Sequence, residues 1–575
     1  MYDYIIKKGT IVDGTGCDGY AADLGIKDGK ITCIGDLEEE YTRSTVIDAE
    51  GKVVCPGFIN MHSHGDQTLF LFPRGESTVK QGITTCYCGN CGATPAPMDK
   101  IWVRKFWEYD AWDIVDPYVE DANTVLPREK VVPVIESYFN IKIDWNTMGE
   151  YMKRLETQGI AYNYIPNVGH GDIRAQVLGG DNRRPDETEL KEMKRYLEQA
   201  LSDGVWGMTT GMDYVPGSYA DLDEISSLVS MVKDAGGIYT THWKNRGADA
   251  MARIAGLQEG FEVARRTGVK LHMNHLSDLY YTTPLEEGES PEDRAEKTLK
   301  FIDAAEAEGI DFIFDVIPNV DAGFEYIPYL AGYFMPWIRI SGSVERFVEN
   351  LKKRDFHKWL KDWILSGRGG LINPRKFPEW SKWIYILASS NCAYAGKSVC
   401  DIFDSKQDRD CVDTVLRLLR EDPMMRTRVI RFNSEIVKTF LHHKLALVGI
   451  DAFNFDGFGT FGNKKDFPDI LVHPNTYYGM VNYILHYGFE RVEDTIRQIT
   501  GKCADWLQLE DRGYLKEGYW ADINVIDFNR LETNENYINP VQYPRGICCT
   551  FVNGIPVVRE GIHTEERPGR VIRRK

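Results

Sequence analysis

The feature that most constrains this chain is the alternation of short apolar runs with amphipathic segments through its central part. The runs are rich in β-branched and aromatic residues, and helical patterns fill many of the gaps between them. The predicted strands are Phe58–Met61, Thr84–Cys88, Tyr162–Asn167, Gly207–Thr210, Ile238–His242, Leu271–His275, Phe312–Val316 and Ala446–Asp451, and examples of the helices are Asp186–Leu201, Leu222–Ala235, Asp249–Thr267 and Asp293–Glu308. Eight strands with helical crossovers predict an α/β fold of the (β/α)8, TIM-like barrel type, whose active site gathers at the C-terminal ends of the strands.

The sequence pattern at both ends of the chain differs from that of the central part. Residues 2–55 contain short strand patterns separated by turn signals such as Asp13-Gly14 and Glu50-Gly51, and similar patterns return at 521–527 and 549–558. We therefore predict one small β-domain from residues 1–55 plus 510–575, and a metal-dependent barrel from residues 56–509. The connection 320–445 contains five tryptophans and is predicted to be a lid-like insertion, in which most of them pack against each other.

The charge balance argues against binding to nucleic acid or to an anionic membrane. The chain has 68 basic and 86 acidic residues, a net charge of −18, and a pI near 5.3. Its first residues lack the apolar segment of a secretory leader, and no stretch reaches the length of a membrane span. We expect a cytoplasmic protein whose cysteines are thiols or metal ligands. Its expected partner is a small molecule, and a homo-oligomeric state is compatible with the sequence.

Two histidines, His62 and His64, follow the first predicted barrel strand with one serine between them. Alternate side chains of a strand share a face, so both imidazoles point the same way. Together they offer half of a divalent metal site. An isolated pair of this kind is more often structural, but the rest of the chain supplies further ligands at other strand ends.

These further candidates are a cysteine and several histidines. Cys91 lies in a glycine-containing loop after the second strand, His242 ends the fifth strand, and His275 ends the sixth. Histidines at neighbouring strand ends, beside His62 and His64, favour a metal centre over structural roles. His170 also falls at a strand end. We expect Cys86 and Cys88 to be buried apolar residues, His272 to be a packing residue, and His442 and His443 to lie on the surface.

A carboxylate completes the set. Asp451 ends the last predicted strand, where it can take a proton from a metal-activated water and pass it to a leaving nitrogen. Asp456 is a rival only five residues further on. We favour Asp451, because an aspartate directly before Gly457 is typical of a turn.

With these residues in place, the chain resembles the amidohydrolase superfamily and, within it, the N-acyl-D-amino-acid deacylase (D-aminoacylase) family. The resemblance covers nearly the whole length. Its motifs are Ile11-Val12-Asp13-Gly14-Thr15-Gly16, Pro56-Gly57-Phe58-Ile59-Asn60-Met61-His62-Ser63-His64, Gly89-Asn90-Cys91-Gly92, Gly169-His170-Gly171-Asp172-Ile173-Arg174, Thr210-Gly211-Met212-Asp213-Tyr214 and His473-Pro474-Asn475-Thr476. The glycine-flanked Cys91 motif is the most specific, because related amidohydrolases use a carboxylated lysine there.

The resemblance implies a Zn²⁺ ion held tightly by Cys91, His242 and His275, with a second, weaker metal position at His62 and His64. It also implies that Asp451 is the catalytic acid and base, and that the enzyme hydrolyses an amide C–N bond other than a peptide bond. Arg174, Tyr214 and Lys244 are the candidate substrate-binding residues. Two alternatives remain open: a cyclic amide or imide hydrolase of the hydantoinase or dihydroorotase kind, and an inactive metal-retaining binding protein.

The chain also departs from the family pattern. Ser277 stands where the family usually has lysine, Ile317-Pro318-Asn319 stands where tyrosines flank the proline, and Lys244 replaces a common arginine. The lysine and a tyrosine of the family help to hold the substrate's carboxylate. Their replacement predicts that simple N-acyl-D-amino acids are poor substrates and that the preferred substrate is neutral at that position.

Overall fold

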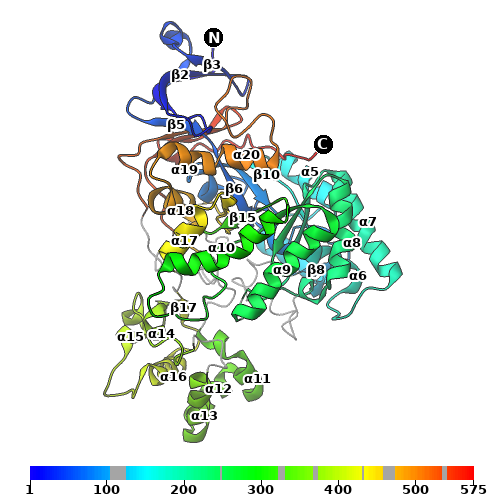
Figure 1. The fold of residues 1–575 in the computed structure, drawn as a ribbon, viewed down its shortest axis with the longest axis vertical. Helices are drawn as coiled ribbons and strands as arrows, with labels where there is room; N and C mark the ends of the chain where they lie inside the picture. Colours follow the sequence, from blue (N-terminus) through cyan, green and yellow to red (C-terminus); the bar gives the residue numbers. More distant parts are fainter. Residues whose placement is uncertain are drawn as a thin grey trace.

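A barrel of parallel strands forms the centre of the molecule (Figure 1). The computed structural model describes residues 1–103, 125–246, 249–320, 330–366, 373–429, 433–456, 473–533 and 541–575. The barrel strands are β6 (Phe58–Ser63), β7 (Ile83–Cys88), β10 (Asn163–Ile165), β11 (Val168–Gly169), β12 (Gly207–Gly211), β13 (Ile238–His242), β14 (Lys270–Met273), β15 (Phe312–Val316) and β18 (Ala446–Val448). Nearly all of their residues are buried, as expected for parallel strands covered on both faces.

The strands close into a ring in sequence order. They pair as β10-β7-β6 and as β11-β12-β13-β14-β15-β18, and β10 and β11 are segments of one strand interrupted at Pro166-Asn167. The ring closes between its last strand, β18, and its first, β6. There the residues that follow β18 bond to the end of β6: the Asp451 N–H donates to the His62 carbonyl and the His64 N–H to the Ala452 carbonyl, each at 2.9 Å. The described residues thus form eight strand positions, which confirms the predicted (β/α)8 barrel.

Amphipathic helices such as α8 (Leu222–Asp234) pack on the outside of the barrel. In α8 the buried Ile225, Leu228, Val229 and Val232 follow helical spacing. The helices are α1 (Glu76–Val79), α4 (Arg128–Phe139), α5 (Met148–Gln158), α6 (His170–Leu178), α7 (Glu187–Asp203), α8 (Leu222–Asp234), α9 (Ala250–Thr267), α10 (Pro291–Ala307), α17 (Ser434–Leu441), α18 (Asn475–Asn482), α19 (Val492–Gln498) and α20 (Gly501–Leu507); the short strands β8 (Ile101–Val103) and β9 (Val125–Pro127) pair beside them. The helix predicted from Asp293 begins at Pro291, because Ser290 and Asp293 form a capping box.

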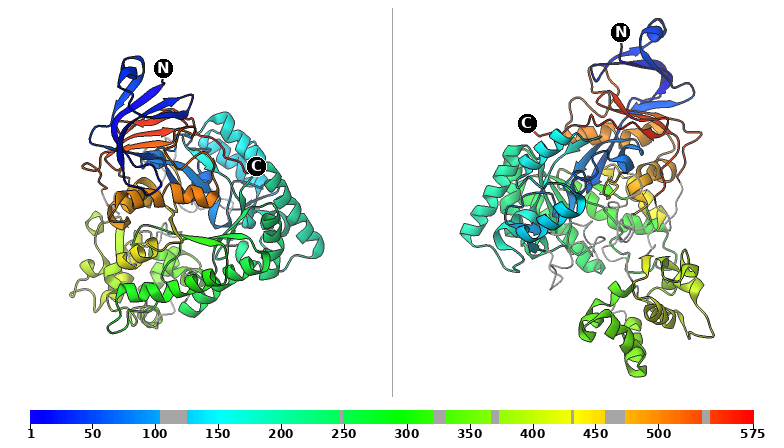
Figure 2. Two further views of the ribbon diagram at one scale, coloured as in Figure 1. Left: turned by 45° about the horizontal axis from the view of Figure 1, so that its top comes forward. Right: turned by 180° about the vertical axis from the view of Figure 1, so that it is seen from behind.

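The two ends of the chain share one sheet (Figure 2). Its order is β22-β21-β20-β19-β5-β1-β2-β3, with β4 beside β1. The strands are β1 (Tyr4–Ile11), β2 (Tyr20–Lys27), β3 (Lys30–Gly35), β4 (Thr45–Asp48), β5 (Val53–Pro56), β19 (Ile523–Ile526), β20 (Ile547–Val552), β21 (Ile555–Arg559) and β22 (Ile562–His563). Antiparallel pairing of β5 with β19 joins the N-terminal to the C-terminal half, so the predicted β-domain is present.

An inserted module, defined here as residues 330–429, extends from the barrel as a separate lobe (Figure 1). It has its own hydrophobic core. The Trp337 ring lies 4.0 Å from that of Trp359 and 5.2 Å from that of Trp363, which supports the expected mutual packing of tryptophans. The module contains α11 (Met335–Ser341), α12 (Val344–Leu351), α13 (Arg354–Leu365), α14 (Trp380–Trp383), β16 (Ile384–Ala388), α15 (Val399–Ile402), α16 (Cys411–Glu421) and β17 (Arg426–Val429). Its predicted role as a lid stays a prediction.

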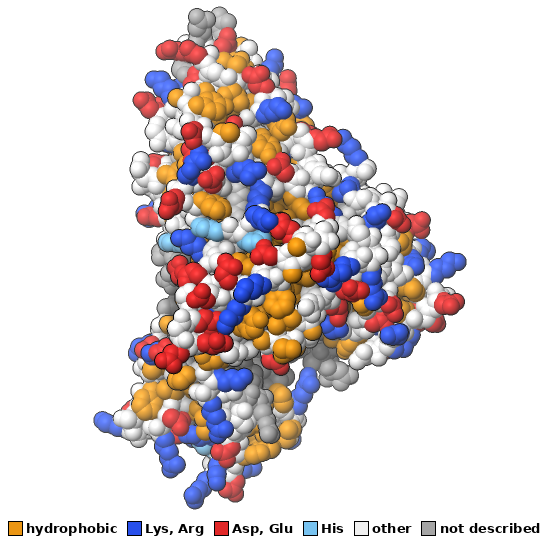
Figure 3. Space-filling model, viewed as in Figure 1, with side chains coloured by type: hydrophobic (Ala, Val, Ile, Leu, Met, Phe, Trp, Pro, Cys, Tyr) orange, Lys and Arg blue, Asp and Glu red, His pale blue; other side chains and the backbone are white. Residues whose placement is uncertain are grey.

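The surface carries charges of both signs. On the face drawn in Figure 3, acidic and basic side chains are interspersed, in keeping with the modest acidic excess of the sequence. Among the described residues, the structure contains no helix that is both long and apolar enough to span a bilayer.

Candidate metal centre

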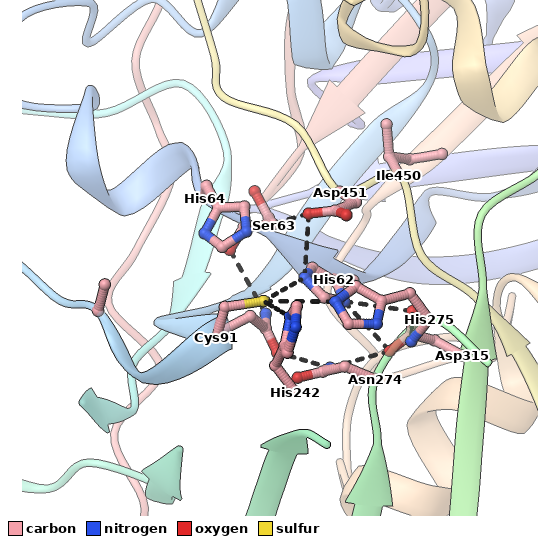
Figure 4. Close-up of polar contacts among 12 residues, drawn as sticks. His62, Ser63, His64, Cys91, His242, Asn274, His275, Asp315, Ile450 and Asp451 are labelled. Carbon is pink, nitrogen blue, oxygen red and sulfur yellow. Dashed lines mark hydrogen bonds and ion pairs between the residues drawn. The ribbon is translucent and has the colours of Figure 1, made fainter. Parts of the chain in front are cut away.

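Residues from five different barrel strands meet in one buried cluster (Figure 4). His62 belongs to β6 and His242 ends β13. Cys91 lies in a 3-10 turn, η3 (Asn90–Gly92), just after β7, while His275 follows β14 and Asp451 follows β18. They meet because all parallel strands of a barrel end at the same face.

Cys91 is the centre of the cluster. Its Sγ atom lies 3.5 Å from His62 Nε2, 3.5 Å from His242 Nδ1 and 3.5 Å from His275 Nε2. All four side chains are buried, with exposures of 4% or less. A thiol surrounded by three imidazole nitrogens is a compact set of soft and intermediate donors.

Asp451 contacts the same ring nitrogen of His62 as Cys91 does. Its Oδ1 is 3.2 Å from His62 Nε2 and 3.0 Å from His64 Nε2. His64 therefore joins the cluster through the carboxylate, and His62 contacts both Cys91 and Asp451 (Figure 4). The arrangement places a proton acceptor directly beside the cluster.

Three residues of the cluster have unusual backbone conformations. Cys91 (φ 55°), His275 (φ 38°) and Asp451 (φ 52°) all occupy the left-handed region. Residues other than glycine adopt this region rarely, and such residues concentrate at functional sites where the surrounding structure holds them. Each turns the chain at a strand end, so that its side chain points into the cluster.

The electrostatic surroundings favour the metal-binding protonation states of Cys91 and His275, but a protonated imidazole at His64. Burial alone would raise the pKa of the Cys91 thiol, but His62, His275 and His242 lower it well below its ordinary value. Burial and the nearby Arg246 guanidinium lower the pKa of His275 to about 4. Burial would lower the pKa of His64, but hydrogen bonding to Asp451 and Cys91 raises it to about 9. A thiolate at Cys91 and a neutral imidazole at His275 are the forms that bind metals.

The donor set fits a divalent metal. Three overlapping groups bring their ligand atoms within 4.8 Å of one another: His62, His64 and Cys91; Cys91, His242 and His275; and His62, His275 and Asp451. Thiolate and imidazole donors suit Zn²⁺ and disfavour Mg²⁺ and Ca²⁺, which bind oxygen. The geometry thus brings together every residue that the sequence analysis named as a metal ligand.

The predicted substrate-binding residues occupy different surroundings. The Tyr214 hydroxyl lies 3.2 Å from His242 Nδ1, inside the cluster. The Lys244 ammonium instead points toward Glu259 of α9, at 3.8 Å.

Arg174 is held by the protein itself. It is fully buried, and its Nη1 donates to both oxygens of Glu224 at 3.0 and 3.3 Å. Its Nε donates to the Pro216 carbonyl and its Nη2 to the Arg183 carbonyl, while His170 also contacts Glu224, at 2.8 Å. These contacts describe a structural network, so Arg174 does not enter the proposed substrate site.

The rival carboxylate Asp456 lies in a loop. Its two oxygens accept the backbone N–H groups of Arg74 and of Glu76, the first residue of α1, so this carboxylate holds a distant segment and lies apart from the cluster. Gly457, on which the prediction of a turn rested, lies outside the described residues. Cys86 and Cys88 are buried, and His442 lies exposed on the surface, both as predicted. His272 is buried too, but its Nε2 lies 2.8 Å from Asp315 Oδ2, so it is not only the packing residue that the sequence predicted.

Three polar residues flank the cluster without belonging to the predicted metal or catalytic set: Asp315, Asp213 and Arg246. Asp315 lies 3.2 Å from His62 Nδ1, Asp213 lies 3.4 Å from His242 Nε2, and the Arg246 guanidinium lies 3.4 Å from His275 Nε2. One signal was available for Asp315, which interrupts the apolar run Phe312-Ile313-Phe314 within a predicted barrel strand. A buried charge in such a strand requires a partner.

Comparison with known proteins agrees with this arrangement. The model of the amidohydrolase family matches residues 45–299. The chain is 26% identical to the D-aminoacylase of Alcaligenes xylosoxydans xylosoxydans, over 100% of this chain and 98% of that protein. The fold is similar to the crystal structure of N-acyl-D-glutamate deacylase from Bordetella bronchiseptica, complexed with zinc and a phosphonate inhibitor (TM-score 0.69, 24% identity, 100% and 99% of the two chains). A crystal structure of D-hydantoinase is less similar (TM-score 0.52, 17% identity, 100% and 99% coverage). The chain is thus similar to amidohydrolases over residues 45–299 and to D-aminoacylases over its whole length.

Proposed function

We propose that this protein is a zinc-dependent hydrolase that cleaves an amide C–N bond of the N-acyl-D-amino-acid type. The observation that carries the proposal is the buried Cys91 thiol, equidistant from three imidazole nitrogens and next to the His62–Asp451 pair. Cys91, His242 and His275 would hold the tightly bound Zn²⁺, and His62 and His64 would form the weaker metal position. Bound there, Zn²⁺ would supply Lewis acidity, which activates water and polarises the amide carbonyl.

Asp451 is the proposed proton carrier. Burial would raise the pKa of Asp451, but the neighbouring His62 and His64 hold it well below its ordinary value, so the group begins as a carboxylate. It can accept a proton from the attacking water and return that proton to the departing nitrogen. Tyr214, whose hydroxyl lies 3.2 Å from His242 Nδ1, stays a candidate substrate-binding residue because it lies beside the cluster.

The full-length similarity to a D-aminoacylase supports the type of bond. The hydantoinase alternative is secondary, since the fold is less similar to that of D-hydantoinase. The cluster also gives no physical reason for an inactive scaffold to retain a carboxylate at position 451. Lys244 is a weaker substrate-binding candidate because its ammonium is directed toward Glu259. A cytoplasmic location and a homo-oligomeric state are further expectations.

The experiment measures metal content and hydrolysis in the same preparations. Dialysed wild-type protein is expected to retain about one zinc per chain. The Cys91→Ala variant should lose that zinc. It should also lose the ability to hydrolyse N-acyl-D-amino acids. Cys86→Ala is the matched control, because Cys86 is also a buried thiol next to this loop but has no role in the cluster. Full activity in a metal-free preparation would refute the proposal.

A further inference from the structure

Two of the three histidines that contact Cys91 direct different ring nitrogens toward it. His62 directs Nε2 toward Cys91 Sγ at 3.5 Å, and its Nδ1 lies 3.2 Å from both carboxylate oxygens of Asp315. His242 directs Nδ1 toward Cys91 Sγ at 3.5 Å, and its Nε2 lies 3.4 Å from Asp213 Oδ2. Each imidazole thus lies between the cluster and a carboxylate outside it.

The Asp315 carboxylate is held in place by contacts other than that with His62. It is fully buried in β15, and its Oδ1 accepts the backbone N–H of His275 at 2.9 Å. Its Oδ2 accepts from the Asn274 side chain at 2.9 Å. A β-carbon at Gly449 would lie 2.5 Å from Asp315 Oδ1, so glycine there allows β18 to approach this carboxylate.

Asp213 is anchored in a different way. It follows β12, and its oxygens accept the backbone N–H groups of Asn245 at 2.7 Å and Arg246 at 2.9 Å. These residues form the turn after β13, in which Asn245 has φ 63°. Asp213 therefore binds both the His242 ring and the turn that follows His242.

The second ring nitrogen of His275, unlike those of His62 and His242, does not face a carboxylate among the described residues. His275 directs Nε2 toward Cys91, while its buried Nδ1 has no hydrogen-bond partner among the residues that the structure describes. Its position is set through the backbone, by the bond from its N–H to Asp315. One carboxylate, Asp315, thus contacts one residue from each of the two proposed metal positions.

We propose that Asp315 and Asp213 are positioning residues that fix opposite tautomers of two metal ligands: His62 with its Nε2 lone pair, and His242 with its Nδ1 lone pair, toward Cys91. A neutral imidazole has one N–H and one lone pair. A carboxylate that accepts the N–H on one side leaves the lone pair on the other. At His62 this requires that Asp315, and not Asp451, which lies 3.2 Å from Nε2, accepts the N–H. The inference rests on the metal centre of the proposed function and adds two residues to it.

The test measures metal binding, so it does not depend on the substrate. Zinc affinity is determined by competition with a chromogenic chelator, and the electronic spectrum of the Co²⁺-substituted protein reports ligand geometry. Asp213→Asn and Asp315→Asn keep size but remove the charge, and each should weaken zinc binding by about 10- to 100-fold and change the Co²⁺ spectrum. Asp213→Glu, which keeps the carboxylate, should recover part of the loss.

Asp408→Asn is the matched control. Asp408 is also a buried carboxylate with strong partners, since it accepts from Arg417 at 2.9 Å and from Thr414 at 3.0 Å, but it belongs to the inserted module. This variant should bind zinc as the wild type does.

The outcomes separate the two proposals. If the wild type itself binds no zinc, the proposed metal centre fails. If the wild type binds zinc and Asp213→Asn matches it in affinity and Co²⁺ spectrum, the positioning role is overturned while the proposed function stands. Should Asp315→Asn fail to fold, as thermal unfolding would reveal, Asp213→Asn decides, because the Asp213 side chain is 26% exposed and close to solvent.

Discussion

Replacing Asp451 with asparagine separates proton transfer from the architecture of the site. Asp451 occupies the left-handed region (φ 52°), which asparagine tolerates better than most residues. Its backbone N–H donates to the His62 carbonyl and is unaffected by the substitution. We therefore expect Asp451→Asn to fold normally and to keep the side-chain volume beside His62 and His64.

The expected loss follows from the chemistry that this side chain performs. An amide cannot accept the proton of the attacking water or deliver it to the leaving nitrogen. Loss of a positioned general base costs about 10²–10⁴ in rate. This corresponds to about 3–5 kcal/mol of additional barrier. Because Asp451 is not one of the three proposed tight zinc ligands, zinc content should stay close to that of the wild type.

The assay follows acid release from N-acyl-D-amino acids and from neutral amides, with zinc measured in the same samples. Asp456→Asn is the matched control, since Asp456 is a partly buried carboxylate that bonds only to backbone N–H groups in the described structure. Burial raises the pKa of Asp456 to about 6. Its replacement should reduce thermal stability slightly and leave the rate nearly unchanged. Retained activity in Asp451→Asn, with loss in Asp456→Asn, would refute the assignment of the carboxylate.

Three further predictions concern other parts of the network. Arg174→Met leaves Glu224 buried without its cationic partner and should lower the free energy of unfolding by about 3–5 kcal/mol in urea denaturation; unchanged stability would contradict the structural role. Gly449→Ala inserts a β-carbon 2.5 Å from Asp315 Oδ1 and should reduce zinc retention on dialysis, whereas normal zinc content would show that the strand can shift freely. Arg246→Met should lower kcat/KM for N-acyl-D-amino acids more than for their carboxamides; an equal effect on both would exclude recognition of the carboxylate by Arg246.

The barrel was predictable because its signals are local. Apolar runs, amphipathic helices and caps such as Asp186 each depend on a few neighbouring residues. The convergence of the proposed metal ligands was predictable for a related reason, since the strands of a parallel barrel all end at one face. Even so, the strand predicted at Tyr162–Asn167 is split at Pro166, where proline cannot donate a ladder hydrogen bond.

The supporting carboxylates were not predictable in the same way. Asp213 and Asp315 follow or lie within different strands, and each acts on a histidine more than 25 residues away. Their roles depend on the direction of side chains, which strand periodicity does not specify for a loop residue such as Asp213. The same limitation misplaced Arg174, which lies near a strand end but turns toward Glu224.

The expected preference for a neutral substrate stays a prediction, and the surroundings of Ser277 and Arg246 bear on it. That preference followed from Ser277, which replaces a lysine that holds a carboxylate. In the structure Ser277 Oγ accepts from Arg253 at 2.9 Å, so a guanidinium already lies beside this position. A second guanidinium, that of Arg246, lies 3.4 Å from His275 Nε2 and has no carboxylate within ion-pair distance among the described residues. A partly buried cation without a counter-ion is better satisfied by an anionic ligand than by a neutral one. We therefore expect that Arg246 allows free acids to be hydrolysed as well as neutral amides, and the comparison of N-acyl-D-amino acids with their carboxamides tests this expectation.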